Sequence, residues 1–173
     1  MSEEENTFTK AKDDFIASWG ALGTSWGISR TMAQIHALLM VSPDPLSTDE
    51  VMEELHISRG NAHTNLKDLV GWGLVRIVVK KGERKEFFEA EKDVWKTFTI
   101  VLKERKRREI EPAITLLQDC AERTKGATSK EEKTFNDQMK ELETFARFAS
   151  NMGEKIALLS YGPAMKIAAK VLK

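Results

Sequence analysis

Residues 58–67 contain no acidic side chain and several that could hydrogen-bond to bases or phosphates. At 100° per residue, Leu66 and Leu69 fall within about 40° of Ala62, so this apolar face is expected to be buried. The opposite face suits a DNA major groove, where Asn and His bond to base edges and Arg binds guanine or phosphate. The candidate DNA contacts on or beside it are Ser58, Arg59, Gly60, Asn61, His63, Thr64 and Lys67.

A second cationic cluster follows within residues 76–85. The β-branched run 74–79 predicts a strand, the turn around Gly82 reverses the chain, and residues 85–90 form the returning strand. Cations at the tip of such a hairpin contact phosphates, and an arginine can enter the minor groove. The alternative is that lysines protect an exposed hairpin edge from aggregation. The candidate contacts here are Lys80, Lys81, Arg84 and Lys85.

The elements around these clusters predict a winged helix-turn-helix. Ser29 is a candidate N-cap for one helix, and Ser47 followed by Glu50 forms the capping-box pattern of the next. A short turn at residues 56–57 precedes Ser58, which caps the helix described above. The order of helix, helix, turn, helix and hairpin is that of a winged helix, and the short turn is its specific element.

Further helices are expected on both sides of this segment. Apolar spacing over residues 15–22 predicts an amphipathic helix that ends at Gly23, and residues from Asp93 onward are helical in pattern. Pro112 either kinks that region or begins a new helix, and Pro163 begins a last short helix. The fold class is therefore mainly α. We expect two parts: an N-terminal helix with a DNA-binding winged helix-turn-helix at 1–92, and a helical dimerisation region at 93–173.

An apolar seam in the C-terminal part predicts self-association. Its residues alternate spacings of four and three, as in a coiled coil, and the face is too apolar to be left in water. A small domain with such a helix needs another surface to cover it, which favours a homodimer. The candidate dimerisation residues are Phe135, Met139, Leu142, Phe145, Ala146 and Ala149.

Composition narrows the class of protein. The 173 residues include 27 Lys plus Arg and 27 Asp plus Glu, which argues against a uniformly basic nucleic-acid coat but permits local clusters. The single cysteine, Cys120, excludes a disulfide framework and suits a reducing cytoplasm. No apolar run approaches the roughly 20 residues that a membrane-spanning helix needs. The acidic start at residues 1–5 differs from a signal peptide. We expect a cytoplasmic protein that does not bind membranes.

The sequence carries no recognisable catalytic or metal-binding motif. His36, His56 and His63 lack the spacing of a zinc site, and His36 lies in an apolar helix, where a core contact is the default. Cys120 has no neighbouring histidine and is expected to act as a small buried hydrophobe. We expect no enzyme activity, no metal ion and no cofactor.

Tryptophans supply a weaker candidate site. Aromatic faces can hold a quaternary ammonium group by cation–π attraction, so Trp19, Trp26 and Trp95 are candidates for a small-molecule pocket. Core and interface packing is the competing interpretation, and the sequence favours it.

Several segments together resemble the GbsR branch of the MarR-like winged helix-turn-helix transcriptional regulators. The resemblance covers about residues 10–110 and is most specific over 47–90, whereas the C-terminal helices agree only in pattern. It implies homodimers, joined by terminal helices, that bind operator DNA with one winged domain per half-site. Some members respond to choline or osmolyte-related ligands. The segments that carry it are Ser47–Leu55, Ile57–Asn61, Leu66–Leu69, Trp72–Val75 and Gly82–Phe88.

These observations predict a dimeric transcriptional regulator, a repressor that occupies operator DNA and whose recognition-helix spacing an effector could change. A second hypothesis is a winged-helix protein–protein interaction module of a transcription or chromosome-structuring assembly. The acidic residues between 49 and 54 and the zero net charge keep this second hypothesis open.

Overall fold

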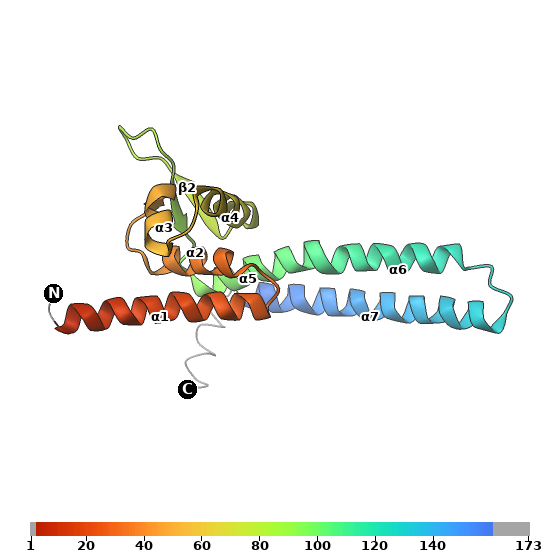
Figure 1. Ribbon diagram of the computed structural model, residues 1–173. Helices are drawn as coiled ribbons and strands as arrows, with labels where there is room; N and C mark the ends of the chain where they lie inside the picture. Colours follow the sequence, from red (N-terminus) through yellow and green to blue (C-terminus); the bar gives the residue numbers. More distant parts are fainter. Residues whose placement is uncertain (1–2, 161–173) are drawn as a thin grey trace. The chain divides into compact units, whose positions relative to one another are not determined.

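The computed structural model describes residues 3–160, and the expected helix after Pro163 lies outside them. The chain divides into two compact units, Met1–Val94 and Trp95–Lys173. Figure 1 shows the ribbon of the chain with its helices and strands labelled. No helix within residues 3–160 has both the length and the apolar character needed to cross a bilayer.

The first unit begins with α1 (Glu3–Ser25), which packs along α2 (Arg30–Val41). A Cβ atom at Gly23 would lie 2.4 Å from the Cβ of Ala33, so only glycine permits this approach of the two helices. The expectation that the first helix ends at Gly23 was therefore wrong. Glycine at this position serves helix packing, and the helix continues to Ser25. Ser29 caps α2 by accepting from the backbone N–H of Met32, as predicted.

The helix-turn-helix consists of α3 (Thr48–Leu55) and α4 (Arg59–Trp72). Ser47 and Glu50 form the predicted capping box of α3, and Ser58 accepts from the N–H of Asn61 to cap α4. His56 ends α3 in the left-handed region, with φ of 51°, which makes the turn between the helices tight. Gly73, with φ of 77°, ends α4 and returns the chain toward the sheet.

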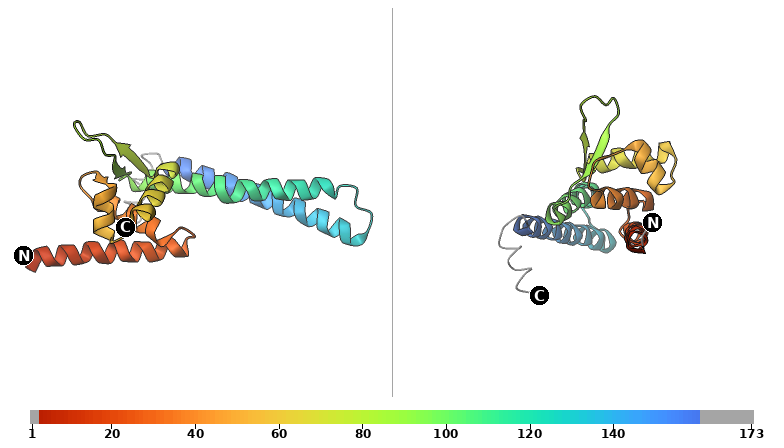
Figure 2. Two further views of the ribbon diagram at one scale, coloured as in Figure 1. Left: turned by 45° about the horizontal axis from the view of Figure 1, so that its top comes forward. Right: turned by 90° about the vertical axis from the view of Figure 1, so that its left-hand side faces the viewer.

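The wing is a three-stranded antiparallel sheet in the order β1-β3-β2. The predicted hairpin is β2 (Val75–Val78) with β3 (Phe87–Ala90), which pairs Val75 with Ala90 and Val78 with Phe87. Sequence reasoning missed the third strand, β1 (Leu46–Ser47), because two residues carry too little pattern to predict a strand. The loop between β2 and β3 projects from the helices of this unit (Figures 1 and 2).

One apolar core joins these elements. The fully buried apolar side chains come from α2, α3 and α4, and strand β3 contributes Phe87 and Phe88, which are both buried. His36 of α2 is buried as well, as predicted, with 6% of its surface exposed. The largest of the fully buried apolar side chains are Ile35, Leu38, Leu39, Leu66, Leu69 and Val51. The winged-helix architecture expected from the sequence is thus confirmed.

The second unit begins with three helical segments that follow one another without a loop: α5 (Val94–Arg105), a π-helical turn η1 (Lys106–Ile110) and α6 (Glu111–Arg123). Pro112 lies in the first turn of α6 and has no N–H to donate to the preceding turn. The backbone N–H of Glu111 instead bonds to Lys106, five residues earlier. The chain thus accommodates Pro112 by one wide turn within a continuing helix.

Residues 124–129 connect α6 to α7 (Lys130–Ser160), and the two helices pack as an antiparallel pair (Figure 2). Ser129 and Glu132 form the predicted capping box of α7. Asn136 is buried and donates to the backbone carbonyl of Ala121 at 2.6 Å and to the hydroxyl of Thr124 at 2.8 Å. These two hydrogen bonds give a partner to a backbone carbonyl in the last turn of α6, and they fix the register of α7 against α6.

Candidate nucleic-acid interface

The outer face of α4 carries the residues that the sequence placed there. Ala62, Leu66 and Leu69 are buried, so the helix is oriented as the wheel predicts. Gly60 adds no side chain, and a Cβ atom there would meet nothing within 4 Å. The exposed residues of α4 that the sequence nominated are Arg59, Gly60, Asn61, His63, Thr64 and Lys67.

These side chains differ in whether they are free to bind a partner. Arg59 forms an ion pair with Asp49, and Asn61 bonds to Asn65 and lies 3.5 Å from Thr31. The Ser58 hydroxyl is used in the cap of α4. In contrast, three of the nominated side chains of α4 have no hydrogen-bond or ion-pair partner among the described residues: His63, Thr64 and Lys67. The neighbouring Asp68 is also exposed and without such a partner there.

The wing cations also fall into two groups. The Nζ of Lys80 lies 4.0 Å from the ring centroid of Phe87 and donates to the carbonyl of Pro45, and the Nζ of Lys85 lies 5.5 Å from the same ring. Lys81 and Arg84 are exposed in the loop, and neither has a partner within the described part of the chain. The structure therefore leaves two of the four nominated wing cations free to contact phosphates.

Most acidic residues of α3 are engaged inside the first unit. Asp49 pairs with Arg59, and Glu54 pairs with Lys12 of α1 at 2.7 Å. Glu50 accepts from the hydroxyl and the backbone N–H of Ser47, and these bonds hold the pKa of its carboxyl below the ordinary value. Two acidic residues of α3 thus pair with neighbouring helices, and a third caps α3 itself.

Two of the three candidate ligand-pocket tryptophans contact each other. Trp19 and Trp26 meet edge to face, with ring centroids 6.0 Å apart, and Phe15 lies 5.5 Å from Trp19. Trp95 is half-buried in α5, in the second unit. Ligand binding by these residues stays a prediction. No group of three His, Cys, Asp or Glu side chains that could hold a metal ion occurs in the described residues.

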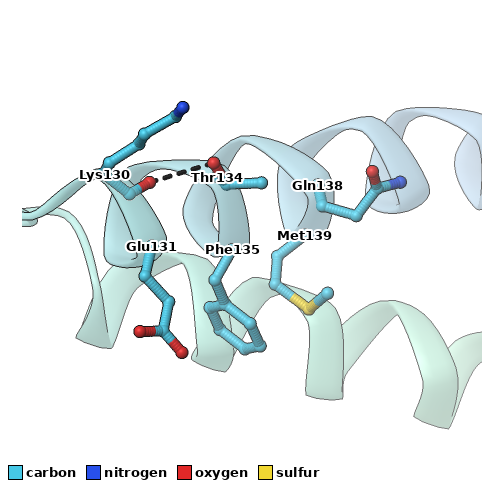
Figure 3. A pocket seen from close by; sticks show the side chains of 6 residues that line it. All are labelled: Lys130, Glu131, Thr134, Phe135, Gln138 and Met139. Atoms are coloured by element: carbon cyan, nitrogen blue, oxygen red, sulfur yellow. Dashed lines mark hydrogen bonds between the residues drawn. The ribbon is translucent and has the colours of Figure 1, made fainter.

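The candidate dimerisation residues divide between two faces of α7. Met139 and Ala146 are half-buried, on the side that also carries the buried Asn136 and Ser150. Figure 3 shows Phe135 and Met139 extending toward α6, in an open hollow that Gln138 also lines. The other nominated residues are exposed, together with two large apolar side chains that the nominated set omits. The exposed apolar face consists of Phe135, Leu142, Phe145, Phe148, Ala149 and Met152.

Asn65 is a residue of this region that the sequence reasoning missed. It lies about 60° from Ala62 on the wheel, at the edge of the buried arc, so a polar residue in an apolar face was the available signal. Only 8% of its surface is exposed, and its side chain bonds to Ser29 and Asn61.

Comparison with known proteins shows which family the winged-helix segment resembles. Residues 26–85, which include α2, the helix-turn-helix and most of the wing, match the sequence model of the MarR family. The chain is also similar to the HTH-type transcriptional repressor GbsR of Bacillus subtilis (strain 168), with 29% identity over 111 residues. That match covers 64% of this chain and 61% of the length of the relative.

A solved structure supports the fold. A crystal structure described as a transcriptional regulator superposes with a TM-score of 0.56 at 20% identity, over 84% of this chain and 99% of that one. The resemblance to the GbsR branch of the MarR-like regulators that the sequence indicates is confirmed by these matches.

Proposed function

We propose that the protein is a transcriptional regulator that binds specific double-stranded DNA as a homodimer. The proposal starts from residues 26–85, which match the sequence model of the MarR family. In this proposal α4 enters the major groove, the wing loop contacts the flanking phosphates or minor groove, and each protomer occupies one half-site. The bound dimer represses by excluding other proteins from the operator. The similar Bacillus subtilis protein is named a transcriptional repressor, which supports repression rather than activation.

The observation that carries the proposal is the free polar surface of α4 and the wing. His63, Thr64 and Lys67 on the helix, and Lys81 and Arg84 in the loop, are exposed and lack partners among the described residues. No acidic residue lies between 58 and 67. Neutral hydrogen-bonding groups at the centre with cations beside them suit base recognition combined with phosphate contacts.

One of the two grounds for the protein–protein interaction hypothesis is weaker in the structure than in the sequence. The hypothesis depended on the acidic third helix and on the zero net charge of the chain. Three of the four acidic residues of α3, namely Asp49, Glu50 and Glu54, are engaged with groups of the same unit. The net charge that α3 can offer to another protein is correspondingly small.

The exposed apolar face of α7 supports the homodimer. Phe145 is 68% exposed and Phe148 is 61% exposed, next to the half-exposed Leu142 and Met152. A contiguous face of this kind on a helix marks an interaction site, because apolar surface in water is unfavourable. A second copy of α7 would cover it with the same residues, as a two-fold interface requires. A small-molecule effector at Trp19, Trp26 or Trp95 stays a prediction.

Titrating the full chain with genomic and random duplexes at two salt concentrations tests this function. We expect some genomic duplexes to bind at least a hundredfold more tightly than random ones, and random binding to weaken steeply with salt. Equal and weak affinity for every duplex at both salt concentrations would contradict the proposal and favour the protein-interaction module.

A further inference from the structure

A buried amide connects the exposed face of α4 to the start of α2. The side-chain nitrogen of Asn65 donates to two oxygens of Asn61, the backbone carbonyl at 2.8 Å and Oδ1 at 2.7 Å. The Oδ1 of Asn65 accepts from the hydroxyl of Ser29 at 2.8 Å. Both ends of this buried side chain are therefore hydrogen-bonded, as the burial of a polar group requires.

The chemistry of these partners determines the orientation of both amides. A backbone carbonyl can only accept, so the group of Asn65 that faces Asn61 must be its NH2. The Asn61 atom that lies 2.7 Å from this NH2 must then be the oxygen. The Nδ2 of Asn61 consequently lies on the exposed side, 3.5 Å from the hydroxyl of Thr31.

The far end of the network is anchored by a helix cap. The hydroxyl oxygen of Ser29 accepts from the backbone N–H of Met32 at 3.0 Å, which is the N-cap bond of α2. Because an oxygen lone pair is used in the cap, the hydroxyl proton is available to Asn65. The orientation of the Asn61 amide is thus held by two helices that pack against each other.

We propose that Asn65 is a positioning residue that fixes the carboxamide of Asn61, so that Asn61 recognises a hydrogen-bond acceptor on a base edge. The proposal rests on DNA binding by α4. Purine N7, guanine O6 and thymine O4 are the acceptors in the major groove. The bidentate pairing of Asn with adenine needs Oδ1 as well as Nδ2 at the base, and Asn65 holds this Oδ1 inward.

Selection from randomised duplexes by the full chain tests the role of Asn65. We expect Asn61→Ala to reduce the base preference at one position of the site by about tenfold, the value of one hydrogen bond to a base. Asn65→Leu should reduce the preference at the same position by a similar factor, and the double variant should reduce it no further. Leu66→Val is the matched control, because it disturbs the buried face of α4 without altering the amide network, and should leave base preferences unchanged.

A change in the DNA tests the atom that Asn61 recognises. The preferred base is replaced with an analogue that lacks its major-groove acceptor. This change should weaken DNA binding by the wild-type protein about tenfold, and it should hardly affect binding by the Asn61→Ala variant. Equal weakening of both proteins would overturn the assignment of Nδ2 as the recognition atom. A base preference that Asn61→Ala removes and Asn65→Leu preserves would overturn the positioning role.

The free protein offers a test that does not depend on DNA or on the folding of a variant. Both side-chain amide protons of Asn65 are hydrogen-bonded and buried, so by NMR they should exchange with solvent at least tenfold more slowly than those of the exposed Gln138. Equally fast exchange would overturn the network. A wild-type protein without any base preference would contradict the proposed function. Base preferences that stay the same in the Asn65→Leu variant would contradict this inference alone.

Discussion

Arg59, the first residue of α4, forms an ion pair with Asp49 of α3, with 2.5 Å between Nη2 and Oδ1. Both side chains are more than half exposed, so the pair contributes little to stability. Its importance lies in its position, because Asp49 neutralises the only cation in the first turn of α4, the helix that is proposed to enter the major groove. Asp49 thus limits how strongly this end of α4 can attract phosphates.

Asp49→Asn should strengthen binding to all duplexes. The substitution removes a negative charge and frees Arg59 for a phosphate, so affinity for random DNA should rise about three- to tenfold and the salt slope should steepen by up to about one ion. Titrations between 50 and 200 mM salt measure both effects. Glu53→Gln is the matched control, since it removes the same charge from α3 without freeing an arginine. Identical effects of the two substitutions would show that Arg59 gains no contact.

Arg84→Ala should weaken binding to every duplex and reduce the salt slope by about one ion, because a free wing cation is lost. Arg76→Ala removes the same charge from β2, but Arg76 is paired with Glu89 at 2.6 Å. We expect the Arg76 substitution to have the smaller effect on both quantities. Salt-dependent titrations of the two variants measure the affinity for DNA and the salt slope. If Arg84→Ala matches the wild type, the wing does not contact DNA.

Phe145→Glu should convert the proposed dimer to monomers. A carboxylate at the centre of the exposed apolar face of α7 would be buried without a partner in a dimer, at a cost of several kcal/mol. Sedimentation measures the oligomeric state, and operator affinity should fall by tenfold or more because the half-sites are no longer bound together. Asn151→Glu adds the same charge at an exposed position outside that face and should preserve the dimer. A dimeric Phe145→Glu protein would show that the interface lies elsewhere.

His36 should make the first unit less stable in acid. Burial lowers the pKa of His36 to about 4, against about 6.5 in an unfolded chain. Between these values the unfolded chain takes up a proton that the folded chain excludes, so the free energy of unfolding falls by up to about 3 kcal/mol as pH drops from 6.5 to 4. Above pH 6.5 this contribution is fully retained.

Urea unfolding of wild type and His36→Leu over this pH range isolates the effect of one histidine. The substitution should flatten the slope and cost little at pH 7, because the Nε2 of His36 has no hydrogen-bond partner in the described part of the chain. His63→Leu, which replaces an exposed histidine, should keep the slope. The same slope in wild type and His36→Leu would show that His36 is not the group responsible.

Local signals made most of the fold predictable. Caps at Ser29, Ser47 and Ser58 satisfy backbone groups within three residues, so the sequence alone places the starts of α2, α3 and α4. Gly23 shows where local reasoning fails. A side chain at Gly23 would collide with Ala33 of α2, so only glycine fits there. No local sequence pattern reveals this contact between two helices.

The sequence predicted which residues form the candidate site. It did not predict which of their side chains have no hydrogen-bond or ion-pair partner. The wheel placed Lys67 on the outer face with Asn61 and His63 beside it, and all three are exposed. It could not show that Arg59 is paired with Asp49, or that Lys80 lies over Phe87, because these partners are distant in sequence. Such pairings depend on the crossing of α3 with α4 and on the strand register.

The most direct test of the account compares affinities for a selected operator and a scrambled duplex at one fixed salt concentration. The side chains of Asn61 and His63 can hydrogen-bond to base edges and should distinguish sequences, whereas Lys67 should bind phosphates, which are alike in every duplex. We therefore expect Asn61→Ala and His63→Ala to lower the operator-to-scrambled ratio by about five- to tenfold, and Lys67→Ala to weaken both duplexes together. A ratio unchanged in both Asn61→Ala and His63→Ala would contradict recognition by α4, and the protein-interaction module would become the better explanation.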